Sequence, residues 1–161
     1  MLLFAFITLT IGCAAPTASE PSVFLQTDQS EYVADAVPGT APRTRYAFAV
    51  ELRLTNNSLQ SVPIGRCGLQ STKPMYSVVL TESAPGQESA YNPVWACLGG
   101  VPPLIVEPGR VRIDTLRIEG PKVFNGITGE PYGVLVGRMH VLLAAGPRGI
   151  RSNAFTVTVR P

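Results

Sequence analysis

The sequence predicts an all-β protein, a single antiparallel β-sandwich of seven to nine strands. Fifteen Gly and fifteen Pro among 161 residues interrupt the chain too often for long helices. Short apolar segments bounded by turn residues recur at intervals of roughly ten residues, as in sandwiches and barrels. Residues 46–54 alternate apolar and polar side chains, which is the period of a strand with one buried face.

The N-terminal half contains the clearest strand. A first strand is expected at residues 23–27 and a second extended piece around residues 32–33, followed by a Pro-containing loop at residues 36–44. The alternating segment 46–54 then directs one set of side chains to a core, and this set is Tyr46, Phe48, Val50, Leu52 and Leu54. The polar sequence Asn56-Asn57-Ser58 is typical of a turn and ends this strand.

The remaining strands are expected at residues 61–64, 75–81, 104–106, 111–118, 132–145 and 154–159, with a further apolar segment at residues 94–98. Pro63 favours an edge position for the first of these, because proline cannot donate to a ladder. The turn Glu107-Pro108-Gly109 joins its two flanking strands in a hairpin-like unit. The apolar residues change parity between Ile113 and Leu116, which predicts a β-bulge there.

The strand order resembles that of bacterial immunoglobulin-like domains, including the group typified by the BsuPI-type proteinase-inhibitor domain. The resemblance covers residues 23–160 and depends on the strand ending at Asn56-Asn57-Ser58, the Glu107-Pro108-Gly109 turn and the closing aromatic strand. It implies an Ig-like sandwich over residues 23–161. It also implies one possible activity, inhibition of a proteinase through an exposed loop.

The N-terminus indicates export. Residues 1–12 form an uncharged apolar run that is too short to span a bilayer but suits a signal segment. The quartet Thr10-Ile11-Gly12-Cys13 resembles a bacterial lipobox, which implies that Cys13 is lipidated and begins the mature chain. Residues 13–22 would then be the acylated Cys and a flexible tether.

Two alternatives to lipidation remain, an ordinary signal peptide cleaved near Ala15 and a short uncleaved anchor. Under the lipobox reading, the protein is exported and lipid-anchored to the bacterial cell envelope. Ala14 stands where an Asp would retain a lipoprotein at the inner membrane, so in a double-membraned cell the resemblance implies the outer membrane, on its periplasmic or surface side.

The two other cysteines predict a disulfide. Setting Cys13 aside leaves Cys67 and Cys97, an even pair in an oxidising compartment. The alternative, a metal site, would need more ligands than these two cysteines and the single histidine, His140, supply. We therefore expect a Cys67–Cys97 bridge and no metal or other cofactor.

Nothing in the sequence identifies a reaction. In a strand, His140 points away from its neighbour Met139, and no nucleophile-elbow pattern is present. A net charge of +2 does not indicate a nucleic-acid partner. Arg43, Arg45, Arg53 and Arg66 suggest either an anionic partner such as a glycan or an ordinary solvated face.

Two loops are long for hairpins in a compact domain, residues 83–91 and residues 120–126. Long loops on a rigid sandwich are common recognition elements. Tyr91, Trp95 and Phe124 lie in or beside them and would be binding anchors if exposed. Trp95 has a second interpretation, packing over the Cys67–Cys97 bridge to seal the core. The sequence thus predicts a non-catalytic binding or envelope-structural domain with a protein or glycan partner.

Overall fold

The all-β class is confirmed. The structure, a computed structural model, describes residues 22–97 and 99–160, and these residues form ten strands and no helix. The strands are β1 (Val23–Thr27), β2 (Glu31–Ala36), β3 (Tyr46–Asn56), β4 (Val62–Ile64), β5 (Tyr76–Leu80), β6 (Leu104–Val106), β7 (Arg110–Gly120), β8 (Gly137–Leu143), β9 (Ile150–Arg151) and β10 (Phe155–Arg160). Ten strands exceed the expected seven to nine, because short pairings such as β9 were not recognised in the sequence.

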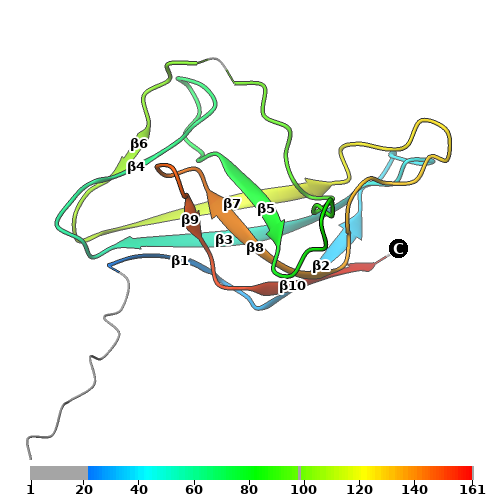
Figure 1. Cartoon of the computed structure of the whole chain (residues 1–161), viewed down its shortest axis with the longest axis horizontal. Coiled ribbons are helices and arrows are strands. Elements are labelled where there is room, and N and C mark those ends of the chain that lie inside the picture. Colours follow the sequence, from blue (N-terminus) through cyan, green and yellow to red (C-terminus); the bar gives the residue numbers. More distant parts are fainter. Residues whose placement is uncertain (1–21, 98, 161) are drawn as a thin grey trace, which may run out of the picture.

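One sheet of eight strands folds over itself (Figure 1). Its order is β1-β3-β2-β10-β8-β5, with β7 added beside β3 and β9 beside β8. Residues from both halves of this path enter one apolar cluster, so the halves face each other as the layers of a sandwich. The largest fully buried members are Tyr91, Phe155, Leu52, Leu54, Ile64, Leu116, Ile118, Met139 and Leu143, followed by Val50, Val78 and Val141.

The sequence predicted a wholly antiparallel arrangement, and this is wrong at one place, because β10 pairs with β2 in parallel. Parallel neighbours need a long connection between them, and here most of the domain lies between the two strands in sequence. The pairing of distant segments is not visible in a local pattern, so the sequence could not indicate it. The immunoglobulin-like connectivity itself stays a prediction.

The expected alternation of β3 is confirmed. Val50, Leu52 and Leu54 are buried, while Glu51 and Arg53 between them are exposed. β3 pairs with β7 along its whole length, from Tyr46 opposite Gly120 to Asn56 opposite Arg110.

The bulge expected between Ile113 and Leu116 is absent, because the β3–β7 register is continuous through both residues. The change of parity has another cause. Leu116 faces the core, whereas Ile113 lies on the outer face with 53% of its surface exposed. The inward position before Leu116 is occupied by Asp114, which forms an ion pair with Arg112 at 2.6 Å.

Two other elements differ from expectation. β6 pairs with β4 rather than with β7, so the Glu107-Pro108-Gly109 turn joins two different sheets. Residues 94–97 form no strand. The strand expected at residues 132–145 is shorter, since β8 begins at Gly137, whose φ of 148° favours glycine.

The N-terminal predictions lie outside the described residues. The lipobox quartet and Cys13 belong to residues 1–21, which the structure does not describe. Among the described residues, no helix is long and apolar enough to cross a membrane.

Candidate ligand-binding site

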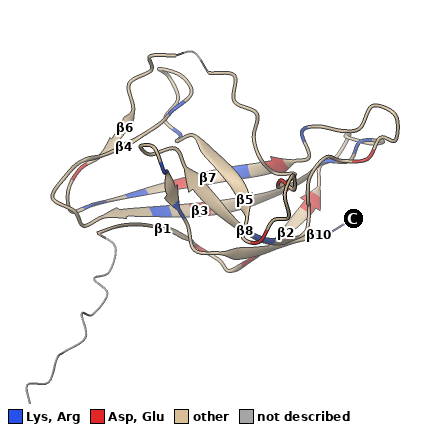
Figure 2. Ribbon diagram, in the orientation of Figure 1, with Lys and Arg blue, Asp and Glu red and all other residues tan. Residues whose placement is uncertain are grey.

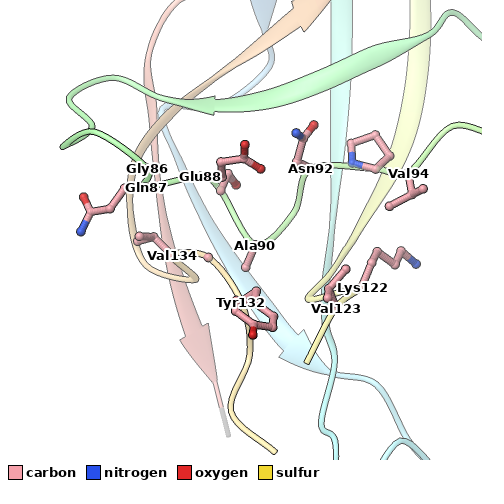
Figure 3. A pocket seen from close by; sticks show the side chains of 13 residues that line it. Gly86, Gln87, Glu88, Ala90, Asn92, Val94, Lys122, Val123, Tyr132 and Val134 are labelled. Carbon is pink, nitrogen blue, oxygen red and sulfur yellow. The ribbon is translucent and has the colours of Figure 1, made fainter. Parts of the chain in front are cut away.

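The two long loops line one pocket. A cavity of about 570 Å³ is enclosed by residues of the segments 86–94, 122–123 and 132–134. Figure 3 shows these segments around Ala90, with Tyr132 on one side and Lys122 and Val123 beside it. The sequence indicated each loop separately, and the fold brings the two together with a third segment.

Backbone hydrogen bonds hold the pocket walls against each other. The Ala90 amide donates to the Val134 carbonyl oxygen at 3.0 Å, and the Val134 amide donates to the Glu88 carbonyl oxygen at 2.8 Å. Ser89 and Val134 form an isolated parallel bridge. Gly133 permits this approach, because its φ is +91° and a β-carbon there would lie 2.8 Å from the Ala90 nitrogen.

Tyr91 is in the core and is not a surface anchor. Its ring is 1% exposed and meets the Phe48 ring edge-on, with 5.1 Å between centroids. Among the described residues its hydroxyl has no hydrogen-bond partner, and burial raises the pKa of this phenol. Tyr91 therefore anchors the loop to the core and positions the pocket without contributing to its surface.

The exposed surface of the pocket combines apolar and polar groups. Val94, Val123 and Tyr132 are 75%, 50% and 57% exposed. Glu88 and Lys122 supply one charge of each sign, and both lie on the rim in Figure 3. Apolar surface with a few polar groups is the usual composition of a binding site. The sequence analysis missed Tyr132 because it assigned this residue to a strand.

Phe124 lies just beyond the pocket, in a tightly folded loop. It forms a bridge with Pro131, and the Arg43 guanidinium carbon is 5.9 Å from its ring centroid, within cation–π range. Between them, the Asn125 side-chain oxygen accepts hydrogen bonds from the amides of Ile127 (2.8 Å) and Thr128 (3.1 Å). Phe124 is thus half-buried, whereas Ile127 at the loop tip is 97% exposed.

The predicted disulfide between Cys67 and Cys97 is confirmed. Trp95 lies nearby but outside the loop pocket. Its indole nitrogen donates to the Tyr76 carbonyl oxygen at 2.8 Å, and its ring meets the Tyr76 ring edge-on at 5.5 Å. Trp95 keeps 38% of its surface exposed and is not a member of the buried core cluster.

No metal cluster is present in the described part of the chain, where no three His, Cys, Asp or Glu side chains come close enough to hold an ion. His140 and Met139 point in opposite directions, with Met139 fully buried. The His140 ring Nδ1 lies 2.8 Å from the Ser152 carbonyl oxygen, so this nitrogen carries the proton and donates.

The four arginines do not form one surface. Arg45 forms an ion pair with Glu119 at 2.8 Å. Arg66 donates to the carbonyl oxygens of Pro102 and Leu69 and so holds two loops together. Arg45 and Arg66 are therefore engaged in separate places, and the arginines that are neighbours in sequence do not form a single anion-binding site.

Comparison with known proteins adds no functional assignment. No protein-family model matches this sequence, and no curated protein is significantly similar to it.

Proposed function

We propose that this protein is a non-catalytic, membrane-anchored binding domain of the bacterial cell envelope that engages a protein or glycan partner at the loop pocket. The observation that carries the proposal is the convergence of both long loops on one cavity of about 570 Å³. Recognition surfaces on sandwich folds are commonly built from loops at one end. The backbone hydrogen bonds that join Val134 to Glu88 and Ala90 keep the cavity preformed, which reduces the entropy cost of binding.

The position of the pocket suits an anchored receptor. Val23 pairs with Asn56 at one end of β3, whereas Gly120, which leads into the pocket, pairs with Tyr46 at the other. The eleven residues of β3 separate these ends by about 33 Å at ~3.3 Å per residue. A domain tethered through the residues before Val23 would direct its pocket away from the membrane, because the two lie at opposite ends of β3.

Photo-crosslinking in intact cells tests the binding site. A photoreactive side chain in place of Tyr132 is expected to give a discrete adduct, and Lys122→Glu should reduce that adduct. The control position is Leu59, which is 96% exposed in the turn after β3. Mass spectrometry of the adduct, together with loss of its added mass on glycosidase treatment, identifies the class of partner. Equal crosslinking from both positions, or none from position 132, would refute the pocket as the site.

The anchor has its own test. Cys13→Ser should abolish incorporation of labelled fatty acid and release the protein from the membrane fraction, because the thioether requires the sulfur. Equal labelling of the wild type and the variant would exclude lipidation at Cys13. The crosslinking experiment is read separately, so the failure of one leaves the other interpretable.

The second candidate function is inhibition of a proteinase. The observation that favours it is Ile127, 97% exposed at the tip of a loop that the Asn125 side chain holds in place. The Asn125 amide also donates to the Glu130 carbonyl oxygen at 2.8 Å. A preorganised loop with one protruding side chain is suited to insertion into a specificity pocket.

A panel of serine, cysteine and metalloproteinases tests this function. Inhibition of any one enzyme should be weakened at least tenfold by Ile127→Asp and unchanged by Leu59→Asp. The two variants alter equally exposed apolar side chains at opposite ends of the domain. The absence of inhibition across the panel would remove this candidate.

A further inference from the structure

β7 is paired on one side only. It lies beside β3, and no other strand of the described chain pairs with it. The Asn57 amide, directly after β3, donates to the Ser22 carbonyl oxygen, and the Glu51 carbonyl oxygen on β3 accepts from the Asp28 amide, so the backbone groups of odd-numbered residues of β3 face β1. Even-numbered residues of β3 therefore face β7, opposite even-numbered partners such as Arg112 and Asp114.

Backbone groups of the odd-numbered residues of β7 consequently point away from the sheet, because the two directions alternate along an antiparallel strand. These residues are Val111, Ile113, Thr115, Arg117 and Glu119. Within residues 22–97 and 99–160, no hydrogen bond joins these backbone groups to another segment. The strand thus presents a row of unpaired donors and acceptors over most of its eleven residues.

Some of the devices that protect edge strands are missing from β7, although it carries charged side chains, including the inward-pointing Asp114. Proteins blunt such edges with proline, bulges or very short strands. β7 has no proline, and its register with β3 contains no bulge. Val111 and Ile113 are β-branched and are 44% and 53% exposed on its outer face, so this edge favours the addition of another strand.

A groove runs beside this edge. A cavity of about 450 Å³ is lined by Leu116 and Arg117 of β7, by Tyr76 and Trp95, and by residues 70–74. Its far wall is fixed, because Trp95 donates to Tyr76 and the Arg112 guanidinium donates to the Thr72 carbonyl oxygen at 2.6 Å. The exposed Trp95 ring would contact alternate side chains of a strand bound to β7.

The charge around the edge is positive. Both acidic residues of β7 are held in ion pairs, Asp114 with Arg112 at 2.6 Å and Glu119 with Arg45 at 2.8 Å. Lys73 and Arg110 lie exposed beside them, as does Arg117, which is 3.9 Å from Glu119, and Figure 2 shows the basic and acidic positions along β7. A partner with acidic side chains would therefore be attracted to this edge.

We infer that the free edge of β7 binds an extended, acidic segment of a partner polypeptide, which adds to the sheet as a further strand. Main-chain hydrogen bonds to the odd-numbered residues would supply affinity, and contacts with Trp95 and the basic side chains would supply specificity. This surface shares no lining residue with the loop pocket. The inference therefore stands independently of the function proposed above.

Hydrogen exchange of the intact chain tests the inference directly. The probes are acetylated heptapeptides in which valine, isoleucine or phenylalanine alternates with glutamate, and matched peptides carry lysine instead. The acidic peptides should slow exchange at least tenfold at the amides of Ile113, Thr115 and Arg117. The amides of Asp114 and Leu116 are already bonded to β3 and should change little. Equal slowing of exchange at the odd-numbered and even-numbered amides of β7, or no binding of the acidic peptides, would overturn the inference.

A proline variant isolates the backbone contribution. Thr115→Pro removes an unpaired amide without removing a bond to β3, and it should weaken peptide binding at least tenfold. Thr115→Val keeps the amide and should bind within twofold of the wild type. If the proline variant does not fold, the difference in hydrogen exchange between odd-numbered and even-numbered amides of the wild-type chain still tests the inference. Sedimentation showing a dimer whose odd-numbered amides are protected without peptide would assign the edge to a second copy and refute a foreign partner.

Discussion

The carbonyl group of Ala90 occupies the position that a β-carbon at Gly120 would take. Gly120 ends β7, and Ala90 lies at the centre of the loop pocket. The absence of a side chain at Gly120 therefore allows the 86–94 loop to pass directly over the end of the sheet. A β-carbon at Gly133 would also meet the backbone of Ala90, at 2.8 Å from its nitrogen.

Gly120→Ala should destabilise the fold and open the pocket, because the obstructing atoms are backbone and cannot rotate away. We expect a loss of about 1–3 kcal/mol in the free energy of unfolding, as for other overpacked sites. Gly126→Ala is the matched control, since a β-carbon there meets nothing within 4 Å. Denaturant unfolding of both variants measures the difference, and equal stabilities would contradict the close approach.

Tyr91→Phe should leave the free energy of unfolding unchanged or raise it by about 1 kcal/mol. The Tyr91 hydroxyl is buried without a partner among the described residues, so its removal relieves an uncompensated desolvation. Tyr91→Ala should cost about 3–5 kcal/mol, because it removes the ring that packs on Phe48. Urea denaturation distinguishes the two. A large loss in the Phe variant would mean that the hydroxyl is bonded.

Asp28→Asn should destabilise the protein at neutral pH but not in acid. Partial burial raises the pKa of Asp28, but hydrogen bonds from the Tyr32 hydroxyl (2.7 Å) and the Glu51 amide (2.9 Å) outweigh it and hold this pKa below 3.8. In turn, burial and Asp28 raise the pKa of Tyr32 to about 12, so its hydroxyl stays protonated and donates.

The direction of this pH dependence follows from the linkage between proton binding and the free energy of unfolding. A folded-state pKa below the unfolded value gives stability that is complete above pH 3.8 and is lost as the pH falls through the folded-state pKa. The wild type and Asp28→Asn should therefore differ in thermal midpoint at pH 7 and converge in acid below that value. The control is Asp35→Asn, which removes an exposed pair with Arg160 and should have little effect at any pH. A constant difference across the titration would contradict the charge effect.

Replacing both Cys67 and Cys97 by Ser should lower the free energy of unfolding by about 2–4 kcal/mol, chiefly because the unfolded chain gains conformational entropy without the bridge. A reductant should lower wild-type stability by a similar amount and leave the double variant unaffected. Mass spectrometry without reduction should find no free thiol at either position. Alkylation of both cysteines in the unreduced protein would contradict the bridge.

Local patterns predicted the strands well where one face is buried and the other is exposed to solvent. β3 and β10 alternate with a period of two, and Val50, Leu52, Phe155 and Val157 are buried as that period requires. β7 shows where the same reasoning fails. Its outer face carries Ile113, so apolar parity alone suggested a bulge that the continuous ladder excludes.

The candidate site was predictable only in part. Loop length indicated both of the loops that line the pocket, but Tyr91, a binding anchor only if exposed, is in the core. Nothing in the neighbouring sequence distinguishes a ring that enters the core from one that faces solvent. Tyr132 was missed because the apolar run before β8 has the composition of a strand, and composition does not show whether a segment pairs with a neighbour.

The sequence by itself determined the all-β class, the amphipathic strand β3 and the pairing of the two remaining cysteines, because composition, period and cysteine count require no knowledge of distant contacts. Only the tertiary structure decided that Ser89 meets Val134, that Ala90 passes over Gly120, and that β7 keeps one edge unpaired. Each of these depends on which strands pair. That choice is made by burying apolar surface from the whole chain at once, so the pocket and the free edge became visible only in the fold.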